Sequence, residues 1–289
     1  MDKIVIKACL NGMRGRERSS QVPWTPAEVA AEARRCAEAG AAVVHIHART
    51  PEGGVSYDPD WYAEADRLIR DQTDLIINHS TARMPDATIE QVLRYLRETP
   101  EPVDMISLNS GNIVFHTPLS EGGRGTIAIP NSYDDIRQIV QVCRERGIVP
   151  EPAVLDTGFL SNVAMFVEDG LLPPPRYLLV EFSGRFGQGL QFMPGTPRSY
   201  AYMTDCVREV FPDATWIAHG FEDSVFTIAS LAISTGAHLR IGFEDRDTLV
   251  DGSPAQSNAD YVNWAVEVAR AHGRRPATPQ EARHILIGE

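Results

Sequence analysis

Short apolar runs alternate along this chain with longer stretches that carry apolar residues at helical spacing. The runs are rich in β-branched residues and lie at residues 4–10, 42–47, 75–78, 103–108, 153–156, 177–182, 216–219 and 238–243. Most of them are almost continuously apolar, which is typical of parallel strands covered on both faces. The pattern therefore predicts eight parallel strands.

The stretches between these runs carry helix-capping signals. Thr25, Pro26 and Glu28 form a capping-box pattern for a first helix, and Gly40 can end it. Comparable signals open helices near residues 58, 85, 133, 160, 196, 222, 258 and 278. Eight alternating units predict one (β/α)8 barrel domain of the TIM-barrel type over residues 1–289, with a C-terminal helical extension. An open doubly wound sheet is the alternative, but no G-x-G-x-x-G motif follows the first run.

Composition narrows the class of protein. The chain has 289 residues and a formal net charge of −12, which argues against nucleic acid as a partner and against a polybasic membrane anchor. No apolar run approaches the roughly 20 residues that a membrane helix needs, and the first residues do not resemble a signal peptide. The four cysteines stand alone in the sequence, so we expect reduced thiols in a cytoplasmic protein.

The strongest chemical signal is a pair of histidines at the end of the second run. His45 and His47 are two residues apart on a predicted strand, so both point to the same face. In a barrel of this type, the carboxyl ends of the strands form the active site. Two imidazoles at such a strand end predict a divalent metal site with positions left open for substrate.

The third metal ligand has to come from another strand end. Glu244 is the best candidate because its parity matches that of the inward positions of the last run. The spacing leaves other ligands open, which are Asp245, His79, His219 and Glu181.

Polar residues at the remaining strand ends are candidates for substrate binding. They are Arg14 after the first run, Ser80 and Thr81 after the third, and Ser107 and Asn109 at the end of the fourth. Lysine is restricted to Lys3 and Lys7, early in the chain, which argues against a Schiff-base lysine at the active face. We therefore expect a metal to polarise any carbonyl substrate.

Several of these segments together resemble the β-keto acid cleavage enzymes, a family of zinc-dependent (β/α)8 barrels. The resemblance is carried by N-G-M-R, G-A-A-V-V-H-I-H-A-R, I-I-N-H-S-T-A-R, M-I-S-L-N-S-G-N, L-D-T-G and R-I-G-F-E-D. It implies a transferase that converts a β-keto acid and acetyl-CoA into acetoacetate and an acyl-CoA by Claisen-type acyl exchange. It also implies a homotetramer.

The resemblance assigns roles to individual residues. It implies that His45, His47 and Glu244 hold Zn²⁺, and that Asp245 and Arg240 form a catalytic dyad in which Asp245 accepts a proton. It further implies that Ser80 and Asn109 line the site, where Ser80 helps to hold the thioester oxygen.

The chain departs from the family pattern at several pocket positions. Arg14 favours an anionic or neutral substrate tail over a cationic amine. The register of Glu151 against a glutamate of the relatives is ambiguous. Because CoA is anionic and the chain is acidic, we also expect a basic entrance, for which the candidates are Arg14, Arg16, Arg18, Arg49, Arg83, Arg124 and Arg185.

Two other functions use the same residues. A metal-dependent hydrolase or a class II aldolase-type lyase would act without any CoA ester. A barrel that binds a metal or a metabolite without catalysis would give no product.

Overall fold

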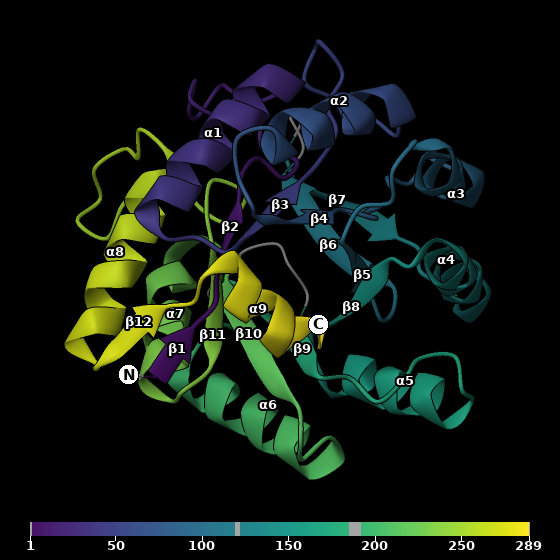
Figure 1. Cartoon of the computed structure of the whole chain (residues 1–289). Helices are drawn as coiled ribbons and strands as arrows, with labels where there is room; N and C mark the ends of the chain where they lie inside the picture. The colour runs from purple at the N-terminus through teal and green to yellow at the C-terminus, as the bar shows by residue number, and fades with distance from the viewer. Residues whose placement is uncertain (1, 119–121, 185–191, 289) are drawn as a thin grey trace.

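The predicted eight-stranded barrel is confirmed. The structure is a computed structural model that describes residues 2–118, 122–184 and 192–288. Its parallel strands close in the order β10-β11-β2-β3-β4-β5-β8-β9 (Figure 1). Their bounds are β2 Ile6–Cys9, β3 Val43–Ile46, β4 Ile76–His79, β5 Met105–Asn109, β8 Val149–Val154, β9 Tyr177–Phe182, β10 Thr215–Gly220 and β11 His238–Ile241.

Helices surround the barrel and cover the outer face of its strands (Figure 1). They are α1 Pro26–Ala39, α2 Pro59–Arg70, α3 Ile89–Glu98, α4 Tyr133–Arg146, α5 Thr157–Glu168, α6 Pro197–Val210, α7 Val225–Ser234 and α8 Asn258–Ala271, with a 3-10 turn at Glu222–Ser224. The Thr25–Glu28 capping box and the left-handed Gly40 are both present at the ends of α1. The outward residues of the strands pack against these helices in one apolar core.

Segments outside the alternating pattern close the two ends of the barrel. At the amino-terminal end, β1 (Asp2–Ile4) pairs with β12 (Arg274–Pro276), and α9 (Pro279–Leu286) follows. An ion pair of 2.8 Å between Arg283 of α9 and Asp104 holds α9 below β5. At the opposite end, β6 (Ile113–Pro118) and β7 (Arg124–Ile129) form an antiparallel hairpin.

The expected boundaries differ from the structure where caps or prolines intervene. Strand β8 begins at Val149, before the expected start at residue 153, although Pro150 and Pro152 interrupt the sequence. Helix α5 begins at Thr157 because the Asp156 carboxylate accepts hydrogen bonds from two backbone N–H groups, and not near residue 160. Helix α3 begins at Ile89 behind a Thr88 capping box, and not near residue 85.

A layer of polar residues crosses the barrel interior beneath the active end. Lys7 of β2 is fully buried and forms an ion pair with Glu151 of β8. Glu151 also accepts hydrogen bonds from Tyr177, at 2.9 Å, and from Asn78, at 3.3 Å. The buried charges of Lys7 and Glu151 thus neutralise each other, because a charge can be buried without a large cost in free energy only when it is paired.

This layer predicts the effect of removing the lysine. Lys7→Met should lower the free energy of unfolding by about 3–5 kcal/mol, because Glu151 would remain buried without its cation. Urea denaturation followed by circular dichroism measures the change. Lys3→Met is the matched control, since exposed Lys3 should matter far less. Equal stability of the Lys7 variant and the wild type would contradict the argument.

Candidate active site

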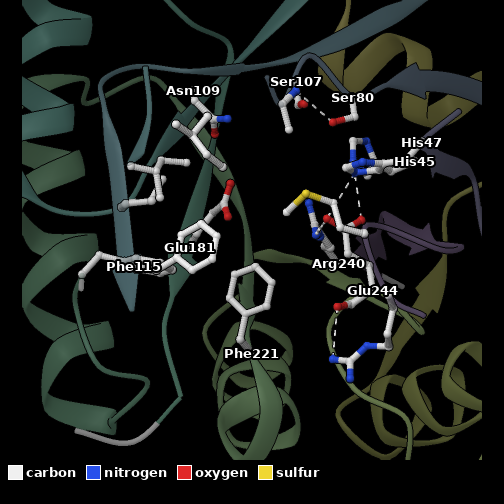
Figure 2. Close-up of a pocket in the computed structure, with 17 residues that line it drawn as sticks. His45, His47, Ser80, Ser107, Asn109, Phe115, Glu181, Phe221, Arg240 and Glu244 are labelled. Carbon is white, nitrogen blue, oxygen red and sulfur yellow. Dashed lines mark hydrogen bonds and ion pairs between the residues drawn. The ribbon is translucent and has the colours of Figure 1, made fainter. Parts of the chain in front are cut away.

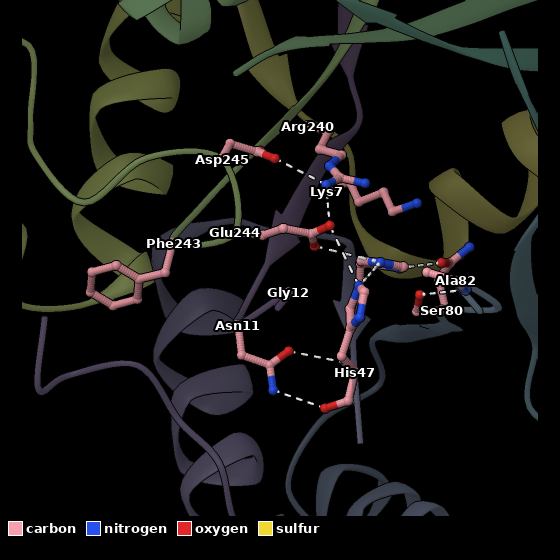
Figure 3. A network of polar contacts seen from close by, with 12 residues as sticks. Lys7, Asn11, Gly12, His47, Ser80, Ala82, Arg240, Phe243, Glu244 and Asp245 are labelled. Carbon is pink, nitrogen blue, oxygen red and sulfur yellow. Dashed lines mark hydrogen bonds and ion pairs between the residues drawn. The ribbon is translucent and has the colours of Figure 1, made fainter. Parts of the chain in front are cut away.

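The two histidines of the second run lie side by side inside the barrel mouth. His45 belongs to β3 and His47 directly follows it; both are buried, and their Nε2 atoms are 3.1 Å apart. Asn11, which follows β2, pins the end of this strand, since its side chain both donates to and accepts from the His47 backbone (Figure 3). The predicted convergence of the pair on one face is therefore present.

The hydrogen bonds behind His45 fix its tautomer. Glu151 can only accept a hydrogen bond from Asn78, so the Asn78 amide nitrogen faces Glu151 and its oxygen faces His45. His45 Nδ1 lies 2.6 Å from that oxygen and must carry the proton. Nε2 is then left with a free lone pair that points to His47, as in a metal-ligating imidazole. Burial lowers the pKa of His45 well below its usual value, which keeps the ring neutral.

Glu244 completes a three-residue cluster with the histidines. Its carboxylate oxygens lie 3.4 Å from His47 Nε2 and 3.5 Å from His45 Nε2. Burial opposes its ionisation, but the Arg240 guanidinium lowers the pKa of Glu244 well below the usual value. The glutamate fits here because a Cβ at Gly12 would lie only 2.2 Å from Glu244 Cγ, which explains the glycine of N-G-M-R.

This donor set suits a divalent metal ion. One candidate ligand atom from each of the three residues lies within 4.8 Å of the others. Glu244 Oε2 is buried and has no hydrogen-bond donor among the described residues, as expected for an oxygen that faces a cation. Two imidazoles and one carboxylate are a common first shell for zinc and related ions.

The other candidate ligands have different partners. His79 points away from the barrel axis and contacts Asp66 of α2 at 2.8 Å. His219 is fully buried between Glu181, 3.1 Å from Nε2, and Asp245, 3.4 Å from Nδ1. None of these four residues joins the His45, His47 and Glu244 cluster.

Arg240 connects the cluster to Asp245. Its Nη2 lies 2.7 Å from Glu244 Oε1 and 3.0 Å from Asp245 Oδ1 (Figure 3). The expected pairing of Arg240 with Asp245 is therefore present. Asp245 itself is fully buried behind Arg240 and does not line the pocket.

The cluster lies in a cavity of about 280 Å³ at the carboxyl ends of the strands (Figure 2). Most of the residues predicted from the strand ends line it, namely His45, His47, Glu244, Arg240, Arg14, Ser80, Ser107 and Asn109. Thr81 does not. Its hydroxyl donates to the Ser107 carbonyl at 2.5 Å, so it supports the wall of the pocket from behind.

The apolar half of the lining was missed by the sequence analysis. It consists of Met13, Ala82, Ile113, Phe115, Ile129, Leu155, Phe192 and Phe221. Three of these residues belong to the β6–β7 hairpin, which is not among the eight strands that the sequence predicted. Two short runs with β-branched residues, at 113–117 and 126–129, flank Gly122-Gly123, and this is the signal that could have identified the hairpin.

Most of the arginines expected at a basic entrance have partners. Arg14 and Arg18 share Glu222, and Arg16 pairs with Glu28. Arg83 pairs with Asp135, and Arg49 donates to backbone carbonyls. Arg124 lies at the start of β7 and is exposed, whereas Arg185 falls outside the described residues.

Comparison with known proteins agrees with this geometry. A family model described as beta-keto acid cleavage enzyme matches residues 3–287. The chain belongs to the β-keto acid cleavage enzyme family. The predicted class, an enzyme that cleaves a carbon–carbon bond of a β-keto acid, is therefore confirmed.

Curated relatives of this family member span almost its whole length. A 3-keto-5-aminohexanoate cleavage enzyme of Fusobacterium nucleatum is 31% identical over 99% of this chain and 98% of the relative. A 3,5-dioxohexanoate:acetyl-CoA acetone transferase of Paraburkholderia graminis is 27% identical over 98% and 95%. A 3-oxoadipate:acetyl-CoA acetyltransferase of Cupriavidus necator is 26% identical over 98% and 94%.

Solved structures support the fold of this family member. The apo structure of ObcA superposes with a TM-score of 0.73 at 18% identity and covers 93% of this chain. This chain spans 66% of the length of ObcA, slightly less than two thirds. Within the described ranges, no helix combines the length and the hydropathy needed to cross a bilayer.

The cluster predicts how one ligand supports metal binding. His47→Ala should abolish stoichiometric binding of a divalent metal, because only two donors would remain. The barrel should stay folded, since this side chain faces the cavity and not the apolar core. Metal content after dialysis and far-ultraviolet circular dichroism test both parts. His79→Ala is the control and should keep its metal, and a fully loaded His47 variant would refute the assignment.

Proposed function

We propose that this enzyme converts a β-keto acid and acetyl-CoA into acetoacetate and the corresponding acyl-CoA, with Zn²⁺ held by His45, His47 and Glu244. The observation that carries this proposal is the three-residue cluster at the base of a single pocket in a member of this family. When bound, the metal would act as a Lewis acid toward the keto and carboxylate oxygens of the substrate.

The polar residues of the pocket can then orient the two substrates. Arg240 places its guanidinium beside the proposed ligand Glu244, where it can also face the substrate carboxylate. The Ser80 oxygen accepts a hydrogen bond from the Ala82 N–H at 3.1 Å, which leaves the Ser80 proton free to donate. We assign this donor to the thioester oxygen of acetyl-CoA, and Ser107 and Asn109 to the substrate wall.

The proposed base is Asp245. Its Oδ1 faces Arg240, whereas Oδ2 is buried without a hydrogen-bond donor among the described residues. An open acceptor position on an arginine-paired carboxylate supports a role in removing the proton between the two substrate carbonyls. The Arg240 guanidinium lies between this carboxylate and the cavity. Proton transfer to Asp245 therefore requires the substrate to reach past the guanidinium.

The substrate tail is proposed to be neutral. The wall opposite the metal ligands consists largely of apolar and aromatic side chains, among them Leu155, Phe115 and Phe221. Arg14 lines the same pocket, and it shares the Glu222 carboxylate, 3.1 Å away, with Arg18. A cationic tail would thus meet an arginine, whereas an uncharged acyl chain fits the apolar wall.

The reaction is tested with purified, zinc-loaded protein, acetyl-CoA and a panel of β-keto acids. We expect acetoacetate and one new acyl-CoA, identified by mass spectrometry, in equal amounts. Omitting acetyl-CoA separates this reaction from a hydrolase or a class II aldolase-type lyase, which would still consume the keto acid. Absence of acetoacetate with every keto acid at full metal occupancy would overturn the proposal, and ligand binding without any product would indicate a non-catalytic barrel.

If Asp245 is the base, a substitution there should lower turnover without affecting metal binding. Asp245→Asn should retain zinc but lose at least about 100-fold in kcat, because the amide cannot accept the proton. Metal content and steady-state kinetics on the same preparation measure both quantities. Normal turnover by the Asn variant would refute Asp245 as the base.

Three expectations remain predictions that follow from the sequence. They are a single domain over residues 1–289, a homotetramer and a cytoplasmic location.

A further inference from the structure

Glu181 is a carboxylate in the pocket that belongs to neither the His45, His47 and Glu244 cluster nor the proposed reaction. It lies at the carboxyl end of β9, lines the cavity and is 9% exposed. Figure 2 shows its carboxylate pointing into the cavity between Asn109 and Phe115, across from His45 and His47. It therefore faces the part of a substrate that lies farthest from the metal ligands.

The surroundings of Glu181 make its charge costly without partners. Phe115, Leu155, Phe192 and Phe221 line the same cavity, and Phe115 and Phe221 lie on the side of Glu181 (Figure 2). A carboxylate in such a setting needs hydrogen-bond donors to replace the water that it loses. Among the described residues, His219 is the side chain within ion-pair distance, and its closest approach, 3.1 Å from Nε2, is to Oε2. Oε1 is therefore available to a ligand.

His219 determines which kind of donor suits this oxygen. It is buried between Glu181 and Asp245, and its ring also packs against Phe221 with centroids 4.8 Å apart. Burial and Arg240 oppose protonation, but Asp245 and Glu181 together raise the pKa of His219 above its usual value. The raised pKa favours the imidazolium form, whose positive charge lies beside the Glu181 carboxylate.

We propose that Glu181, held in place by His219, is a specificity-determining residue that accepts a hydrogen bond from a hydroxyl group on the acyl tail of the substrate. This proposal rests on the proposed function, which places the keto and carboxylate groups of the substrate at the proposed metal ion and the acyl tail across the cavity. A hydroxyl can donate to Oε1 without bringing a charge. An ammonium group would add a second positive charge beside His219, which already faces Glu181. A carboxylate would be repelled by the Glu181 carboxylate.

The test compares straight-chain β-keto acids of equal heavy-atom number that end in a methyl or a hydroxyl group, over a series of chain lengths. Binding to the zinc-loaded protein is measured by calorimetry without acetyl-CoA, and kcat/KM is measured with it. At the best length, the wild type should prefer the hydroxyl acid by about 10-fold to 100-fold, because a hydrogen bond to a charged group gives discrimination of this order.

Two substitutions separate hydrogen bonding from shape. Glu181→Leu should remove the preference, weaken the hydroxyl acid by about 10-fold to 100-fold and bind the methyl acid at least as well as before. Glu181→Gln keeps an acceptor oxygen and should retain part of the preference. Glu168→Leu makes the same change on the exposed surface of α5 and should leave both affinities unchanged.

Each outcome decides between the alternatives. An unchanged ratio in the Leu variant, or a wild type that prefers the methyl acid, overturns the assignment of Glu181. A preference for a matched ammonium acid overturns the hydroxyl as the recognised group. If both acids bind but no acetoacetate forms, the proposed function fails while the calorimetric ratio still decides the role of Glu181. If neither acid binds at any length, both proposals fail.

Discussion

The active site depends on how one buried lysine is neutralised. Lys7 of β2 lies inside the barrel, and Glu151 of β8, on the opposite side of the barrel, provides its counter-charge. Glu151 then fixes the orientation of the Asn78 amide, and Asn78 fixes the proton on His45 Nδ1. The Lys7–Glu151 pair thus determines which nitrogen of His45 carries a free lone pair at the barrel mouth. A substitution in this buried layer would therefore change the geometry of the His45, His47 and Glu244 cluster.

Arg240 has a comparable role at the mouth itself. It lies between Glu244 and Asp245, so a single guanidinium pairs with two neighbouring buried carboxylates. The same guanidinium separates Asp245 from the cavity. Charge compensation therefore controls both which oxygen is available to a metal and which carboxylate a substrate can reach.

The two sides of the pocket have different origins. The proposed metal ligands and the hydroxyls come from strand ends, where the barrel fixes their positions. The apolar wall comes partly from the β6–β7 hairpin, which is an addition to the barrel pattern. Glu181 lies where these parts meet, which is why we connect it with the identity of the substrate rather than with the chemistry of the keto acid.

The amino-acid sequence alone predicted the barrel, the convergence of His45 and His47, and Glu244 as the best of several candidates for the third ligand. It could do so because strand parity and strand ends are local properties, and a barrel directs all strand ends to one face. The folded structure was needed to show that His79 faces Asp66, that Thr81 supports the pocket wall from behind, and that Asp245 is buried. Those outcomes depend on contacts between residues far apart in the chain, for which spacing along the sequence carries no signal.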